Sequence, residues 1–400
     1  MASTSPEASA RKLFTACVGG RPWSRDALVS LAQPEGTTAL FRDLVEPLAD
    51  LFEPTLVDCY VGIFSEVMAQ SIPSLNAAEI RKRFQRIRSP RRFHGGQVDR
   101  VYVLSRVTLG ADIAITSQFL QAACALFPDA DIYFVGPSKN YELFAGNPRI
   151  QLLEATYSRS GLLADRLRTG MELSQQLSHP QSLVLDPDSR LSQLGLLPLG
   201  EESNYYFFES RSYGYPGTKC LGQLAGDWLN EIFRFYGAMP WIKTNPICTK
   251  PVTRAEITVS FGFGDNPAKR VGPDFELEVV RSLRREGHAV LIDEGGSPDE
   301  QQNAHRIAHA TGAQTYQGSF ACFSQAIGSS RLYLGYDSVG QHAAAALGVP
   351  VITAFRGWAN DRMRQRWTPW GQGARHVLPL TMEDSSDSAE QMIALAKELL

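Results

Sequence analysis

Three patterns of apolar residues follow one another along the chain of 400 residues. Between about residues 10 and 90, apolar residues recur every three or four positions, as in TTALFRDLVEPLADLF (37–52), which predicts amphipathic helices. From residue 100 onward, apolar runs of strand length alternate with helical segments, beginning with the strand VYVLSRV (101–107). The same alternation restarts at residue 256. We therefore expect a helical segment followed by two α/β units.

We divide the chain into a helical extension (1–95), an N-terminal Rossmann-like domain (96–245) and a C-terminal Rossmann-like domain (246–400). Each α/β domain is expected to be a doubly wound, mostly parallel sheet that binds ligands at the carboxyl ends of its strands. The stretch MPWIKTNPICTKPVT (239–253) is typical of an extended linker. The last helix, within 387–400, could pack back on the N-terminal domain.

Composition narrows the class of protein only a little. Apolar residues make up 44% of the chain and charged residues 20%. The formal charge is −3, so the overall charge does not favour the binding of nucleic acid. The N-terminus lacks the apolar core of a signal peptide, and no window approaches the roughly 20 apolar residues of a membrane helix, so we expect a cytoplasmic protein. The six cysteines lack zinc-site spacing, and we expect them to be reduced, with no metal bound.

The segment Arg81–Arg92 is rich in arginine and lysine. Its simplest interpretation is a solvated helix face ahead of a Pro and Gly-Gly linker. The alternative is a positive patch that contacts an acidic acceptor, a partner or the inner face of a membrane. The sequence leaves both open.

The turn SRVTLGADIAITS (105–117) joins a strand to a helix without the G-x-G-x-x-G of a dinucleotide site. Asp112 could cap the helix, or it could act as a general base toward an acceptor hydroxyl. Thr116 and Ser117 could hydrogen-bond the acceptor or only the backbone.

The turn SFGFGDNPAKR (260–270) has the residues that a nucleoside diphosphate requires when no metal is present. Gly262 and Gly264 let the backbone approach a ligand, Asn266 turns the chain, and Lys269 and Arg270 would face the negative charge. The turn is not a P-loop, which needs G-x-x-x-x-G-K-[ST]. A solvated lysine is the alternative.

In the turn LIDEGGSPDE (291–300), Asp293 and Glu294 could accept hydrogen bonds from a ribose or a base. A plain Gly-Gly turn explains this stretch equally well.

The stretch YDSVGQHAAAALGVPVITAF (336–355) predicts a loop, a helix start and a buried strand. Ser338, Gly340 and the N–H groups of 339–342, that of Gln341 among them, could hold a phosphate at the positive end of the helix. Asp337 would be repelled by this phosphate and would face a sugar hydroxyl. His342 could donate to the phosphate or be a packed side chain. A plain helix cap at 337 or 338 is the structural alternative.

Together these stretches resemble the heptosyltransferase family of glycosyltransferases (family 9). The resemblance rests on VYVLSRVTLGADIAITSQFLQAACALFPDADI with GNPRI downstream, on FGDNPAKR, on YDSVGQHAAAALGVPVITAFRGW and on RWTPWG. It covers about residues 100–400 and is strongest in the C-terminal domain, whereas the helical segment has no counterpart in the family. The resemblance implies a GT-B fold, in which two Rossmann-like domains face each other across a cleft.

The resemblance also implies transfer of a sugar from a nucleoside diphosphate sugar to an acceptor hydroxyl, with inversion and without an essential metal. The best-known members use ADP-heptose. Lys269 matches the family's lysine at the donor phosphates, and Asp337, Ser338 and His342 match its D-[ST]-G-x-x-H helix start, with Val339 in place of the glycine.

The catalytic aspartate of the family directly follows the glycine of an L-G-D turn. Here Asp112 stands one residue later, after Ala111. Either the longer turn still lets Asp112 act as the base, or Asp186 or Glu209, which could also contact the acceptor, takes its place.

The leading hypothesis is an inverting, metal-independent glycosyltransferase of the bacterial cell envelope, cytoplasmic or peripheral at the inner membrane face. It would use no cofactor, and its acceptor would be a glycan, a lipid or another hydroxyl compound. One alternative is a nucleotide-sugar epimerase or hydrolase on the same fold. The other is a non-catalytic nucleotide-sugar-binding protein that docks a partner through its helical extension.

Overall fold

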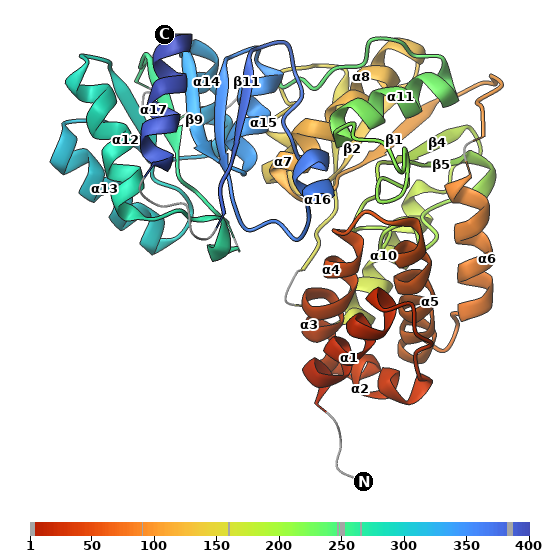
Figure 1. Cartoon of the computed structure of the whole chain (residues 1–400). Helices are drawn as coiled ribbons and strands as arrows, with labels where there is room; N and C mark the ends of the chain where they lie inside the picture. The colour runs from red at the N-terminus through yellow and green to blue at the C-terminus, as the bar shows by residue number, and fades with distance from the viewer. Residues whose placement is uncertain are drawn as a thin grey trace.

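The computed structural model describes residues 5–89, 91–158, 161–245, 248, 253–264, 266–381 and 387–400. Figure 1 shows two α/β units side by side, with a body of helices below one of them. The described residues form a five-stranded and a six-stranded sheet, and all strand pairs in both are parallel. The predicted α/β fold class is confirmed.

The N-terminal sheet has the order β3-β2-β1-β4-β5, with β1 at Arg100–Leu104, β2 at Asp131–Gly136, β3 at Ile150–Glu154, β4 at Ser182–Asp186 and β5 at Tyr205–Phe207. Its helices are α7 (Leu109–Ala111), α8 (Ser117–Leu126), α9 (Ser138–Tyr141), α10 (Leu163–Leu177) and α11 (Leu221–Phe233). Alternate residues of β1 face opposite sides, because Val101 and Val103 join one core and Tyr102 and Leu104 the other. Both faces of this central strand are therefore buried.

The helical segment comprises α1 (Pro6–Val18), α2 (Val29–Ala32), α3 (Thr37–Leu40), α4 (Glu46–Ala49), α5 (Pro54–Ser71) and α6 (Ala77–Arg88). Its buried side chains, Leu44 and Phe64 among them, lie in one cluster with Tyr102 of β1 and Val184 of β4. The segment therefore covers one face of the N-terminal sheet and shares its core.

The basic segment fastens α6 to the N-terminal domain. Arg83 is buried, donates to the carbonyl of Gly195 at 3.1 Å and stacks over the ring of Tyr205. Arg86 forms an ion pair with Glu202 at 2.7 Å. The expectation of a solvated face is therefore wrong for Arg83, because this side chain docks the helix. Membrane contact by this segment stays a prediction.

The C-terminal sheet has the order β11-β10-β9-β6-β7-β8, with β6 at Ile257–Ser260, β7 at Val290–Asp293, β8 at Gln314–Tyr316, β9 at Leu332–Tyr336, β10 at Val351–Phe355 and β11 at Arg375–Pro379. Its helices are α12 (Pro273–Arg285), α13 (Pro298–Thr311), α14 (Phe320–Ser329), α15 (Val339–Ala346), α16 (Asp361–Arg366) and α17 (Ser388–Leu399). The order of strands changes direction at β6 and β9, which is where doubly wound sheets bind ligands.

The last helix packs within its own domain. Met392, Ile393 and Ala396 of α17 lie in the C-terminal core, and α17 contacts α12 and β10. The expectation that this helix could return to the N-terminal domain is wrong, because its apolar face is already buried here.

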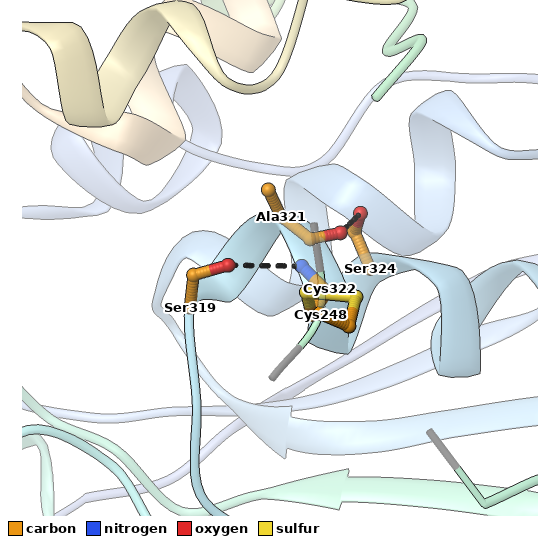
Figure 2. Close-up of a disulfide and its surroundings, with 5 residues drawn as sticks. All are labelled: Cys248, Ser319, Ala321, Cys322 and Ser324. Carbon is orange, nitrogen blue, oxygen red and sulfur yellow. Dashed lines mark hydrogen bonds between the residues drawn. A yellow bond between two sulfur atoms is a disulfide. The ribbon is translucent and has the colours of Figure 1, made fainter. Parts of the chain in front are cut away.

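Four of the six cysteines form disulfides, which corrects the expectation that all are reduced. Cys17 of α1 is bonded to Cys59 of α5, and Cys248 to Cys322 of α14. Figure 2 shows the second bond at the first turn of α14, where the hydroxyl of Ser319 accepts from the backbone N–H of Cys322 at 3.3 Å. This bond ties the segment between the domains to the C-terminal domain. The expected cytoplasmic location stays a prediction.

The expectation that no stretch approaches a membrane helix is wrong for Leu109–Leu126, which is long and apolar enough to cross a membrane by length and composition. In the structure it runs from α7 through a π-helical turn (Asp112–Thr116) into α8, and 67% of it is buried inside the protein. It therefore packs as a core helix of the N-terminal domain.

Candidate active site

The turn after β1 and the start of α15 meet at the junction of the two domains. A Cβ atom at Gly110 would lie 3.2 Å from Cδ2 of His342 and 3.4 Å from the Cα of Val339. Only a residue without a side chain fits easily in so close an approach. The carboxyl ends of β1 and β9 therefore face each other, and Figure 1 shows α7 and α15 between the two sheets.

On the C-terminal side of this junction, Lys269 reaches the loop before α15. Its ammonium group lies 2.8 Å from Oδ2 of Asp337 and donates to the backbone carbonyl of the same residue at 3.0 Å. The other carboxylate oxygen of Asp337 accepts from Nε2 of Gln341 at 2.5 Å. The lysine side chain is still 22% exposed, so it can exchange partners with a ligand. The structure thus brings together Lys269, Asp337 and Gln341, three of the predicted donor residues. Asp337 was expected to face a sugar hydroxyl, whereas here it pairs with Lys269. Donor binding by these residues stays a prediction.

The first turn of α15 has backbone N–H groups without a side-chain cap. Ser338 is the N-cap residue, but its hydroxyl makes no cap hydrogen bond. Among the described residues, this buried oxygen makes no hydrogen bond of good geometry, although it interacts with the hydroxyl of Tyr333. The hydroxyl of Tyr333 occupies the space that a Cβ atom at Gly340 would take. A hydroxyl that caps no N–H group, beside amide groups that no side chain caps, is suited to an oxyanion ligand.

His342 is a buried, neutral side chain behind this turn. Burial lowers its pKa to about 4, although the carboxylate of Asp337 acts in the opposite direction. Its ring lies 6.2 Å from that of Trp367, whose carbonyl accepts from Gln341 at 3.4 Å. Trp367 was not among the predicted site residues, although it lies in the RWTPWG stretch that carried the family resemblance.

A small pocket lies at the carboxyl ends of β6 and β7. The predicted residues Gly262, Arg270 and Asp293 line it. Asp293 accepts from the hydroxyl of Ser260 at 3.0 Å, and burial raises its pKa to about 6. Glu294 lies 3.1 Å from Nε2 of His305 and does not line this pocket.

The remaining predicted donor residues shape the turn after β6. Asn266 caps its short 3-10 helix by accepting from the backbone N–H of Ala268 at 3.1 Å. Gly264 adopts a positive φ of 60°, a conformation that favours glycine. Arg270 forms two hydrogen bonds with buried Glu276, at 2.9 and 3.0 Å, which hold its guanidinium at the wall of the pocket.

Asp112, the predicted general base, is fully buried. Its carboxylate accepts from the hydroxyls of Ser105 at 2.6 Å and Thr116 at 2.7 Å, from the backbone N–H of Arg106 at 2.7 Å, and from Nδ2 of Asn140 at 2.6 Å. Burial raises its pKa, and these four donors act in the opposite direction. Because the donors occupy both oxygens, an acceptor hydroxyl could bind only by replacing one of them. Its role as the base stays a prediction.

The predicted acceptor residues are buried as well. Thr116 donates to Asp112, and the hydroxyl of Ser117 donates to the carbonyl of Ile113 at 2.6 Å. Asp186 accepts from Ser189 N at 2.6 Å, and burial raises its pKa to about 6.

Glu209 is the last of these residues. It accepts from the N–H groups of Arg211 at 2.8 Å and Ser212 at 3.0 Å. Burial raises its pKa to about 7, and the nearby charge of Asp188 acts in the same direction. As in the case of Asp186, its contacts are with the protein itself. Among the described residues, no three His, Cys, Asp or Glu side chains are grouped as metal ligands.

The fold alone places the chain in a structural class. Two Rossmann-like parallel sheets whose carboxyl ends face each other form the GT-B architecture.

Solved structures agree with this class. The glycosyl transferase family 9 protein of Veillonella parvula has a TM-score of 0.53 and 16% identity over 76% of this chain and 91% of its own. The ADP-heptose LPS heptosyltransferase II of E. coli has a TM-score of 0.54 and 16% identity over 76% and 98%. The E. coli heptosyltransferase WaaC with ADP has a TM-score of 0.55 and 14% identity over 75% and 100%.

At such identities the likeness concerns the fold alone, and at that level it confirms the predicted resemblance. About a quarter of this chain is not covered by these structures, a share about as long as the helical segment. No protein-family model and no curated protein matches the sequence.

Proposed function

We propose that this protein is an inverting glycosyltransferase that moves a heptose-like sugar from a nucleoside diphosphate sugar to an acceptor hydroxyl. The single observation that carries the proposal is the juxtaposition of Lys269 with the uncapped first turn of α15. This is the positive charge and the set of N–H donors that a diphosphate requires. Two solved structures that share the fold, E. coli WaaC with ADP and with ADP-2-deoxy-2-fluoro heptose, also support a nucleoside diphosphate sugar as the donor.

In the proposed reaction, the donor diphosphate displaces Asp337 from Lys269 and lies against the N–H groups of α15. Its base and ribose extend toward the pocket that Asp293 lines. The acceptor oxygen attacks the anomeric carbon from the side of the N-terminal domain, and the bond from this carbon to the phosphate oxygen breaks. The electron pair leaves with the diphosphate, where Lys269 and the helix amides stabilise it, so the proposed transfer needs no metal.

The acceptor proton goes to a carboxylate in this proposal. Asp112 lies two residues after Gly110, which contacts α15, and it is therefore the candidate nearest in the chain to the domain junction. Its raised pKa favours proton uptake, provided that the acceptor hydroxyl takes the place of one of its four donors. Asp112→Asn should then abolish turnover and leave nucleotide binding unchanged.

A screen of ADP, UDP, GDP and their sugar conjugates by thermal shift tests the proposal. At least one nucleotide is expected to raise the melting temperature of the wild-type protein but not that of Lys269→Met. Lys397→Met is the matched control, because Lys397 pairs with Glu286 on the surface at 2.7 Å. Equal stabilisation of wild type and Lys269→Met would contradict the proposal.

The burial of Asp112 favours one other function, that of a non-catalytic nucleotide-sugar-binding protein. In that case the donor binds, no acceptor yields product, and Asp112→Asn has no effect on any activity. Release of nucleoside diphosphate in the presence of an acceptor extract, compared with its absence, separates the two functions. An epimerase or hydrolase would instead consume the donor without an acceptor.

A further inference from the structure

A hollow lies between the helical segment and the N-terminal domain. The helical segment contributes Phe41, Glu46 and Asp50 to its wall, and the domain contributes Tyr157, Arg190 and Gln193. Its enclosed part has a volume of about 30 Å³, and the rest of the hollow is open to solvent. The hollow is therefore a shallow depression that would take the edge of a ring rather than enclose it.

The charges in this hollow are balanced. Arg190 pairs with Glu46 at 2.6 Å, and Arg211, which also lines the hollow, pairs with Asp50 at 2.6 Å. Two cations and two anions leave no preference for a charged ligand. The ion pairs fix the carboxylates and guanidinium groups in place, while Glu46 and Asp50 remain 42% and 33% exposed. Such groups can accept from and donate to the hydroxyls of a neutral ligand.

One buried polar atom in this wall lacks a partner. Gln193 is only 2% exposed, and its Nε2 donates to the carbonyl of Arg190 at 3.0 Å. Its Oε1 has no hydrogen-bond partner among the described residues. A buried carbonyl oxygen without a donor is costly, so this atom is suited to receive a hydroxyl of a ligand.

The hollow also presents two aromatic rings that are held in place. The guanidinium of Arg166 lies 4.5 Å from the ring centre of Phe41 and 5.0 Å from that of Tyr157. It also donates to the hydroxyl of Tyr157 at 3.0 Å. Aromatic rings fixed in this way at the wall, beside hydrogen-bonding groups, fit a ligand ring that is apolar on its C–H face and polar at its rim.

We propose that this hollow is a saccharide subsite, which holds a neutral, hydroxyl-rich ring of the acceptor. The inference rests on the proposed function, because a glycosyltransferase needs a place for its acceptor. A chain of contacts links the hollow to the turn at the domain junction. Arg211 lies 3.3 Å from Asp188, Asp188 lies 3.6 Å from Arg106, and the N–H of Arg106 donates to Asp112. The helical segment thus forms part of the acceptor site.

Saturation-transfer NMR on the full chain, without nucleotide, tests this subsite. The probes are D-glucose, D-galactose, D-mannose, N-acetylglucosamine and a free heptose. At least one is expected to receive saturation from the wild-type protein. Tyr157→Ala removes an aromatic ring, and Gln193→Leu removes the unpaired carbonyl oxygen of the side chain. Each substitution is expected to weaken sugar binding by about tenfold or more. Tyr236→Ala is the control, because Tyr236 is 73% exposed and does not line the hollow.

The subsite is overturned if none of the five sugars binds, or if binding persists unchanged in both variants while their melting temperatures show that they are folded. ADP binding, measured by thermal shift on the same samples, separates this failure from that of the proposed function. If ADP binds and no sugar binds, only the proposed subsite is contradicted. If a sugar binds and no nucleotide binds, the subsite is supported and the proposed transferase activity is contradicted.

Discussion

The two turns that meet at the domain junction are built in opposite ways. After β1, the carboxylate of Asp112 is fully buried and accepts four hydrogen bonds from its own domain. After β9, the ion pair of Lys269 and Asp337 is partly exposed, and the hydroxyl of Ser338 makes no cap hydrogen bond. The carboxylate of Asp112 stabilises the first turn, whereas Lys269 and the N–H groups of the second turn could bind a ligand. A strand-end turn with polar residues is therefore not by itself a binding site.

The largest effect is expected at the first turn. Asp112→Ala leaves the four donors without their acceptor, so the free energy of unfolding should fall by about 3–5 kcal/mol. Urea denaturation measures this loss. Asp165→Ala is the control, because Asp165 forms a surface pair with Arg168 and its removal should change stability by less than about 1 kcal/mol. Similar small losses in both variants would show that the first turn is not held by Asp112.

His342 gives the second turn a distinct dependence on pH. The pKa of this residue is about 4 in the folded chain, below its ordinary value of 6.5, so the unfolded chain takes up a proton first as the pH falls. Stability from this residue is complete above pH 6.5 and is lost as the pH falls toward 4.

Compared with His342→Gln, the wild-type protein should lose on the order of 3 kcal/mol of unfolding free energy between pH 7 and pH 4. The raised pKa values of Asp186, Asp293 and Glu209 act in the opposite direction, but they are common to both proteins and cancel in the difference. Parallel stability curves over this range would contradict a buried neutral histidine.

Lys269→Met should separate ligand binding from folding. The variant leaves Asp337 with Gln341 as a donor, so we expect a loss of only about 1–2 kcal/mol in unfolding free energy. Its affinity for the nucleoside diphosphate, measured by calorimetry, should fall about tenfold to a hundredfold. An affinity equal to that of Lys397→Met would place the phosphates away from this lysine.

The smallest effect is expected for Ser338→Ala. Because its hydroxyl caps no backbone N–H and interacts only with the hydroxyl of Tyr333 among the described residues, the unfolding free energy should change by less than about 1 kcal/mol. Affinity for the nucleotide should still fall about threefold to tenfold, since the hydroxyl would donate to a phosphate oxygen. A clear loss of stability without a loss of affinity would make Ser338 a structural residue.

Much of the fold could be predicted from the sequence. The apolar runs marked the central strands, because parallel strands are buried on both faces. The proximity of Lys269 to the start of α15 followed from the rule that turns at the carboxyl ends of neighbouring strands meet, since β6 and β9 pair directly.

Other features depend on contacts between distant parts of the chain, which local patterns do not reveal. The burial of Asp112 needs Asn140, 28 residues away. The shared core of the helical segment and the N-terminal sheet left no mark in the sequence beyond ordinary amphipathic helices, and the spacing of 42 residues between Cys17 and Cys59 did not indicate a bond. The short strand β11 was missed, because its run HVLP is brief and only partly buried.

The most direct test of the central claim is a crystal structure of the protein with ADP. The account predicts that the diphosphate lies within hydrogen-bond distance of the ammonium group of Lys269 and of the backbone N–H groups at the start of α15, with Asp337 displaced from the lysine. A diphosphate bound elsewhere, with the Lys269–Asp337 pair intact, would contradict it.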